Sequence, residues 1–81
     1  MTIESQRRNI LGYMLRGLVL SPEDARRMFG CNRLAARIWE IRKVVGVDVR
    51  THRSGRKTWA EYSISEENRL LYYESHGGVV K

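Results

Sequence analysis

Cysteine and proline each occur once in this sequence, and long apolar runs are missing. The lone Cys31 cannot form an internal disulfide, and no other ligand stands near it at the spacing of a metal site. No apolar run approaches the about 18 residues that a membrane-spanning helix needs. Residues 1–5 also lack the pattern of a secretion signal. These absences exclude a disulfide scaffold, predict that no metal is bound, and favour a cytoplasmic protein.

Positive charge is abundant and unevenly distributed. Fifteen Lys and Arg residues against nine Asp and Glu residues give a net charge of +6. Residues 1–64 hold 13 basic and 6 acidic residues (+7), whereas residues 65–81 hold 2 basic and 3 acidic residues (−1). Such a surface attracts a polyanion before contact, although solubility alone also explains it. With 42% apolar residues, the 81 residues predict one compact folded domain.

Two helices are predicted in the first part of the chain. Apolar residues at helical spacing predict a helix over about residues 6–16, with Ser5 as its N-cap. The string Ser21-Pro22-Glu23-Asp24 supplies a cap, a proline at the first helical position and two acids near the positive end of the helix dipole. A second helix therefore begins here, and Gly30 is expected to end it.

A third helix follows almost at once. Asn32 is its expected N-cap, and an apolar stripe made by Leu34, Ile38, Ile41 and Val45 continues to Gly46. The predicted helix therefore covers residues 32–45. Two helices joined by a Gly-containing turn of about three residues form the helix-turn-helix layout.

Alternating apolar and polar residues then predict a β-hairpin. One strand runs from Val47 to about Thr51, and Thr58, Ala60, Tyr62 and Ile64 share one face of the other. Pairing Val49 with Tyr62 would place Arg50 opposite Glu61, and Gly55-Arg56 would form a type II′ turn. Leu18, Val19 and Leu20 are expected to add a short strand, and Ser65 to cap a last helix that carries Leu70, Leu71, Tyr72 and Tyr73.

The third helix carries the candidate base-reading side chains. A helix in the DNA major groove needs an apolar back, a small residue for close approach, and long polar side chains directed outward. Arg33 and Arg37 are candidates for guanine, and Ala36 for a thymine methyl. The predicted DNA-binding set on this helix is Asn32, Arg33, Ala36, Arg37, Glu40 and Lys43. The alternative is that these side chains only solvate the exposed side of a core helix.

The hairpin tip is the second candidate surface. Arg53, Arg56 and Lys57 crowd one tight turn, where their charges repel one another unless an anion such as phosphate lies between them. A solvated tip that discourages edge aggregation is the alternative interpretation.

Aromatic residues and histidines are assigned smaller roles. Trp39 is expected at the rim of the helix 32–45 stripe, and Trp59 on the outer face of the hairpin. The pair Tyr72-Tyr73 is expected either to cover the core or to form a dimer contact. His52 and His76 have no carboxylate or thiol at motif spacing, so we expect no catalytic residue, no enzyme activity and no cofactor.

Several of these segments together resemble a known family. They are Leu20-Ser21-Pro22-Glu23-Asp24-Ala25, Phe29-Gly30, Arg33-Leu34-Ala35-Ala36-Arg37-Ile38, Ile41-Arg42 with Gly46, and Ala60-Glu61-Tyr62-Ser63-Ile64. The chain from about Ser5 to Ile64 is similar to the small winged helix-turn-helix domains of phage and prophage proteins. The resemblance implies a winged-helix fold and a setting in a bacterium or an infected host cell. It does not imply a target, because fold is not function.

The sequence therefore predicts an α+β winged helix-turn-helix protein with a three-helix core, a hairpin wing and a short extra C-terminal helix. Residues 1–64 are the predicted DNA-binding domain, and residues 65–81 a helix and tail for packing or a dimer contact. The predicted function is binding of double-stranded DNA by a small phage or bacterial transcriptional regulator. A module binding a host or phage protein, an architectural or recombination accessory factor, and a protein of structured RNA stay open as alternatives.

Overall fold

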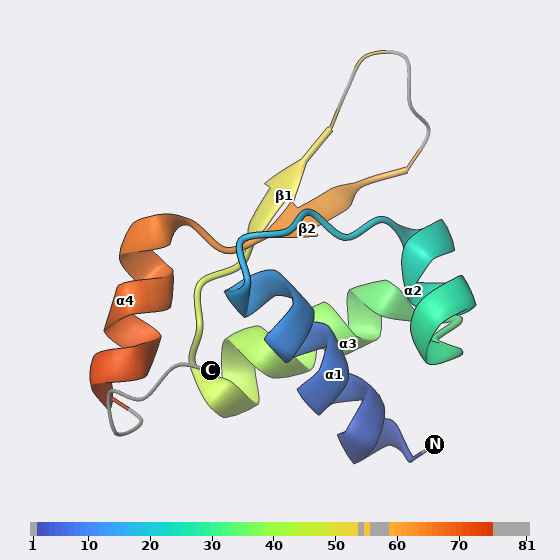
Figure 1. Ribbon diagram of the computed structural model, residues 1–81. Helices are drawn as coiled ribbons and strands as arrows, with labels where there is room; N and C mark the ends of the chain where they lie inside the picture. The colour runs from blue at the N-terminus through green and yellow to red at the C-terminus, as the bar shows by residue number, and fades with distance from the viewer. Residues whose placement is uncertain (1, 54, 56–58, 76–81) are drawn as a thin grey trace.

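The computed structural model describes residues 2–53, 55 and 59–75 of the chain (Figure 1). In this part the fold is α+β, with four α-helices and a two-stranded antiparallel sheet. Helix α1 crosses in front of α3, α2 and α4 lie on opposite flanks, and the hairpin projects away from the helices (Figure 1). The core gathers apolar side chains from α1, α3, the hairpin and its flanking segments, among them Ile10, Met14, Leu20, Ile38, Ile41 and Ile64.

Helix α1 covers Ile3–Leu15 and begins earlier than the sequence predicts. Thr2, and not Ser5, is the N-cap, because the Thr2 hydroxyl accepts a hydrogen bond from the Ser5 amide at 3.0 Å. Glu4 in the first turn adds a favourable charge at the helix start. The predicted start at residue 6 is therefore wrong, whereas the expected apolar face is confirmed, with Ile10 and Met14 fully buried.

Helix α2, Pro22–Phe29, forms as predicted. The Ser21 hydroxyl accepts from the Asp24 amide at 3.1 Å. Gly30 ends the helix in the left-handed conformation at φ 63°, where a side chain would be strained. Strong local signals thus fix both ends of this helix.

Helix α3, Leu34–Glu40, continues into a π-helical turn, η1, at Ile41–Val45. The predicted cap Asn32 is wrong, because Arg33 occupies the N-cap position and no side chain caps the helix. The C-terminal end is as expected, with Gly46 left-handed at φ 86°. Its amide donates to the Ile41 carbonyl at 3.0 Å, a bond that spans five residues and widens the last turn.

The hairpin pairs β1, Arg50–His52, with β2, Glu61–Ser63. Its register differs from the prediction, since Thr51 and not Val49 opposes Tyr62. The Val49 carbonyl instead accepts two hydrogen bonds from the Arg42 guanidinium, at 3.2 and 2.7 Å. The Val49 carbonyl is therefore bonded to a side chain of η1, whereas the predicted register placed Val49 opposite Tyr62 in the sheet.

In place of the strand predicted at residues 18–20, the structure has a single β-bridge between Leu20 and Tyr62. The Leu20 amide donates to the Tyr62 carbonyl at 2.8 Å, and the Tyr62 amide donates to the Leu20 carbonyl at 2.9 Å. Leu20 is fully buried, whereas Leu18 and Val19 are exposed. Leu20 thus joins the segment between α1 and α2 to β2 through one β-bridge.

Helix α4, Glu66–Ser75, contributes no fully buried residue. Ser65 caps it as predicted, accepting from the Asn68 amide at 3.3 Å. The Tyr73 hydroxyl donates to the Leu15 carbonyl at 2.9 Å, and the Arg69 guanidinium donates to the Ile64 carbonyl at 2.8 Å. These polar contacts, together with the half-buried Tyr72 ring packed against the core, attach this helix to the rest of the fold.

Candidate functional site

The outward side of α3 and η1 is the first element of the candidate site. Asn32 and Arg33 lie exposed in the turn before the helix, Lys43 is exposed near its end, and Ala36 is half-buried between them. No ion pair involves Arg33 or Lys43 in the part of the chain that the structure describes. This face therefore offers two uncommitted positive charges at its ends and a small residue near its middle.

Trp39 belongs to the same face, although it was expected at the rim. Its side chain is 59% exposed. On a helical wheel of about 100° per residue, Trp39 and Lys43 lie only about 40° apart. The helical spacing of Trp39 and Lys43 could have predicted this position from the sequence. The large aromatic ring instead favoured the prediction that Trp39 packs at the rim of the core. A large apolar ring that remains exposed on a charged face is a candidate contact for a partner.

Arg37 and Glu40 are not part of this exposed face. Arg37 is 8% exposed and its guanidinium donates to Glu40 Oε2 at 2.8 Å. The other carboxylate oxygen of Glu40 meets the Arg7 guanidinium of α1 at 3.5 Å. The predicted outward orientation of Arg37 is therefore wrong.

The helical wheel explains how Arg37 enters the fold. It lies about 60° from Leu34 and so at the edge of the apolar stripe. There its aliphatic stem can be buried while its charged head reaches the Glu40 carboxylate. Glu40 then joins α3 to α1 through Arg7, while its second carboxylate oxygen holds Arg37 on α3 itself.

Arg42 has a role that sequence reasoning missed. Besides its two bonds to the Val49 carbonyl, its guanidinium donates to the Thr51 hydroxyl at 2.9 Å. One planar side chain thereby joins η1 to the start of the hairpin. The hairpin is thus held in a defined position relative to α3.

The hairpin supplies further positive charge. Arg50 and Arg53 are exposed, and neither has an ion pair among the described residues. Arg56 and Lys57, the other predicted tip residues, and the predicted Gly55-Arg56 turn fall wholly or partly outside the described residues. Trp59 is 45% exposed and borders a hollow of about 240 Å³ with three residues of α2, Pro22, Glu23 and Arg26.

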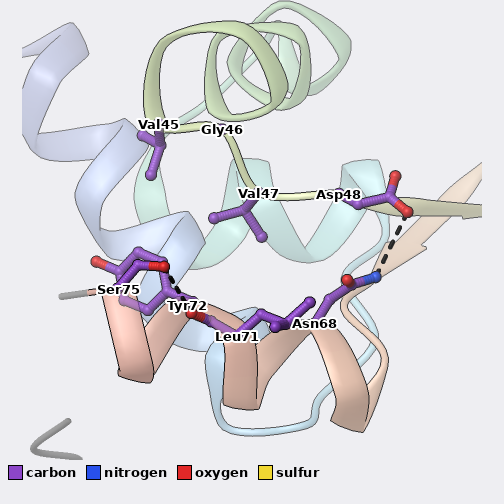
Figure 2. Close-up of a pocket in the computed structure, with 8 residues that line it drawn as sticks. All are labelled: Val45, Gly46, Val47, Asp48, Asn68, Leu71, Tyr72 and Ser75. Atoms are coloured by element: carbon purple, nitrogen blue, oxygen red, sulfur yellow. Dashed lines mark hydrogen bonds between the residues drawn. The ribbon is translucent and has the colours of Figure 1, made fainter.

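A cleft of about 210 Å³ lies between α4 and the segment that follows α3 (Figure 2). The side chains of Val45 and Val47 point toward α4 across it (Figure 2). Its polar groups bond one another, since the Asn68 amide donates to the Asp48 carboxylate at 3.4 Å. The Ser75 hydroxyl likewise donates to the Leu71 carbonyl at 2.9 Å. The cleft is therefore a space between α4 and residues 45–48 in which these polar side chains are already hydrogen-bonded.

Comparisons of the chain with protein-family models, with curated proteins and with solved structures find no match. In residues 2–53, 55 and 59–75, no helix is both long and apolar enough to cross a membrane. The same residues hold no cluster of three or more His, Cys, Asp or Glu side chains placed to bind a metal ion. Function must therefore be inferred from the exposed surface of this chain itself.

Proposed function

We propose that this chain is a winged helix-turn-helix protein that binds double-stranded DNA, with α3 and η1 in the major groove and the hairpin on the sugar-phosphate backbone. The observation that carries the proposal is the outward face of α3, where Arg33 and Lys43 are exposed without an ion pair among the described residues. Ten residues separate these two charges, or about 15 Å along a helix. The major groove is about 12 Å wide, so both charges can reach its walls.

The residues between these charges suit a close approach to base edges. Ala36 is small enough to let the helix backbone come near the bases, and its methyl group can contact a thymine methyl. Trp39, with 59% of its surface exposed, adds an apolar contact beside it. Arg37 and Glu40 are no longer proposed as base-reading residues, because they bond each other.

The hairpin is the proposed source of backbone contacts. Arg50 and Arg53 are exposed on it, and Arg42 holds its base against η1. Two basic elements with a fixed relative position can engage one duplex together without an ordering cost at the moment of binding. Such phosphate contacts supply affinity, whereas α3 supplies discrimination between sequences. With the resemblance to phage and prophage domains, this arrangement favours a small transcriptional regulator.

Binding of labelled duplexes at several salt concentrations tests the proposal. We expect Arg33→Ala to weaken binding by about tenfold or more, since a lost base or phosphate contact costs about 1 to 3 kcal/mol. Arg16→Ala, at the C-cap of α1, removes the same charge outside α3, η1 and the hairpin and is the matched control. Equal losses in the two variants, or binding that does not weaken as salt rises, would contradict the proposal.

Selection of bound duplexes from a random pool then separates the two kinds of DNA-binding protein. A shared motif in the selected duplexes supports a sequence-reading regulator. Selection of bendable sequences without a motif would point instead to an architectural protein.

A further inference from the structure

A groove of about 390 Å³ lies between α1 and α2, and no residue of α3 lines it. Its apolar side is formed by Tyr13 and Phe29, whose rings meet edge to face at 5.9 Å between centroids, and by Met28, which is 44% exposed. Gly12 lies in its wall, and nothing occupies the space within 4 Å of where a Cβ would stand. The backbone of α1 is therefore open to close approach in the middle of the groove.

Positive charges mark the two ends of this groove. Arg8 and Arg16 both line it, and both are exposed without an ion pair in the part of the chain that is described. They are eight residues apart, or about 12 Å along the helix axis. Among the residues that the structure describes, no acidic side chain lines the groove. Its chemistry thus suits an apolar segment with a negative charge at each end.

One face of α4, with Leu71 at the edge of the cleft beside this helix, has the complementary pattern. Glu67, Leu70, Leu71 and Glu74 follow one another at i, i+3, i+4 and i+7, so they form one face of the helix, called here the acidic ridge. The two leucines are 57% and 52% exposed. The two glutamates stand about 10 Å apart along the axis. Neither glutamate has an ion pair among the described residues.

We propose that the occupant of the groove is a second copy of this chain, whose acidic ridge docks between α1 and α2. The charges of the groove and the ridge are opposite in sign, and their spacings along the two helices, about 12 and about 10 Å, are similar. The leucines would lie against Met28 and the aromatic side of the groove. The ridge cannot fill the groove of its own copy, because α2 and α4 lie on opposite flanks of the molecule (Figure 1). A contact between two different surfaces is heterologous, and a single helix in a groove buries little area. The result is weak head-to-tail association.

Charge exchange between the two surfaces tests the proposal without DNA. The double variant Arg8→Glu/Arg16→Glu makes the groove acidic, and Glu67→Arg/Glu74→Arg makes the ridge basic. Sedimentation of the unmodified chain over a wide concentration range at low salt should show self-association. Each double variant alone should associate more than about tenfold more weakly, because like charges then face each other. An equimolar mixture of the two variants should associate again, since each ridge then meets a groove of opposite charge.

The matched control is Arg26→Glu/Arg50→Glu. It lowers the net charge by the same amount as Arg8→Glu/Arg16→Glu but leaves the groove and the ridge intact. It should associate as the unmodified chain does, and circular dichroism should show the same helix content in every variant. The proposal is overturned by a chain that stays monomeric throughout, by double variants that associate undiminished, or by a mixture that stays monomeric. Loss of association in the matched control would also overturn it, because net charge would then govern the contact.

Discussion

Helices α3 and α4 are attached to the same core by different forces. Ile38 of α3 and Ile41 of η1 are 1% and 0% exposed, so apolar burial holds this continuous helical segment in place. Helix α4 has no fully buried residue: half-buried Tyr72 packs against the core, and single hydrogen bonds from Arg69 and Tyr73 reach carbonyls of neighbouring segments. A typical hydrogen bond contributes only about 1 kcal/mol of net stability. The fold therefore joins a firmly packed α3 to a loosely attached α4.

The difference suits the functions proposed for the two helices. A helix that reads base edges needs a fixed backbone, because small displacements of its side chains spoil their contacts. Helix α3 meets this need through its apolar stripe, the Arg7–Glu40–Arg37 network and Arg42. Helix α4 offers exposed leucines and acids, and its attachment allows adjustment when a partner docks. The following substitutions test how far this comparison holds.

Replacement of a buried α3 residue should have the largest effect. Ile38→Ala should lower the free energy of unfolding by about 2 to 5 kcal/mol, because it removes apolar contacts and leaves a cavity. The matched control is Leu70→Ala on α4, where 57% exposure predicts almost no change. Urea denaturation measures both values. Comparable losses in the two variants would show that the two helices do not differ as described.

Glu40→Gln should have the second largest effect. It leaves the guanidinium of Arg37, whose side chain is 10% exposed, without the charge that faces it at 2.8 Å. We expect a loss of about 1 to 3 kcal/mol in the free energy of unfolding, the cost of a buried polar group deprived of its partner. Glu23→Gln, at an exposed position in the first turn of α2, is the control and should cost less, about 0.3 to 1 kcal/mol, because it removes only a charge near the positive end of the helix dipole. A neutral Glu40→Gln would mean that the network does not fasten α3 to α1.

Local signals in the sequence predicted much of this fold. The two ends of α2 and the end of η1 depend on caps and left-handed glycines within a few residues, and Ser21, Gly30 and Gly46 act as expected. The errors arose where a side chain makes a contact outside its own helix or strand. Glu40 meets Arg7, which is 33 residues away, so no local pattern predicted the network that holds Arg37 inward, although the place of Arg37 at the edge of the apolar stripe was a local sign of its burial. The two hydrogen bonds from Arg42 to the Val49 carbonyl span only seven residues, but strand alternation reports which face a side chain occupies and does not report such a contact.

The candidate site was predictable in the same uneven way. The exposure of Arg33 and Lys43 follows from the apolar stripe opposite them. Trp39 was misplaced because an aromatic residue is usually packed, although its position on the wheel places it beside Lys43. The helical period therefore predicts which side of α3 faces outward. It does not predict which side chains of that face turn inward to pair with another residue, as Arg37 and Glu40 do.

Tyr73→Phe should have the smallest effect on stability, and this effect should be limited to α4. The substitution removes the hydroxyl that donates to the Leu15 carbonyl at 2.9 Å and leaves the ring in place. A loss of about 1 kcal/mol should raise the exchange rates of α4 backbone amides about fivefold. Amides of α3 should keep their rates, because local opening of α4 leaves the buried stripe of α3 intact. Hydrogen exchange followed residue by residue distinguishes this result from a uniform rise in both helices. A uniform rise would mean that α3 and α4 open together, and that the loosely attached helix is in fact part of one cooperative unit.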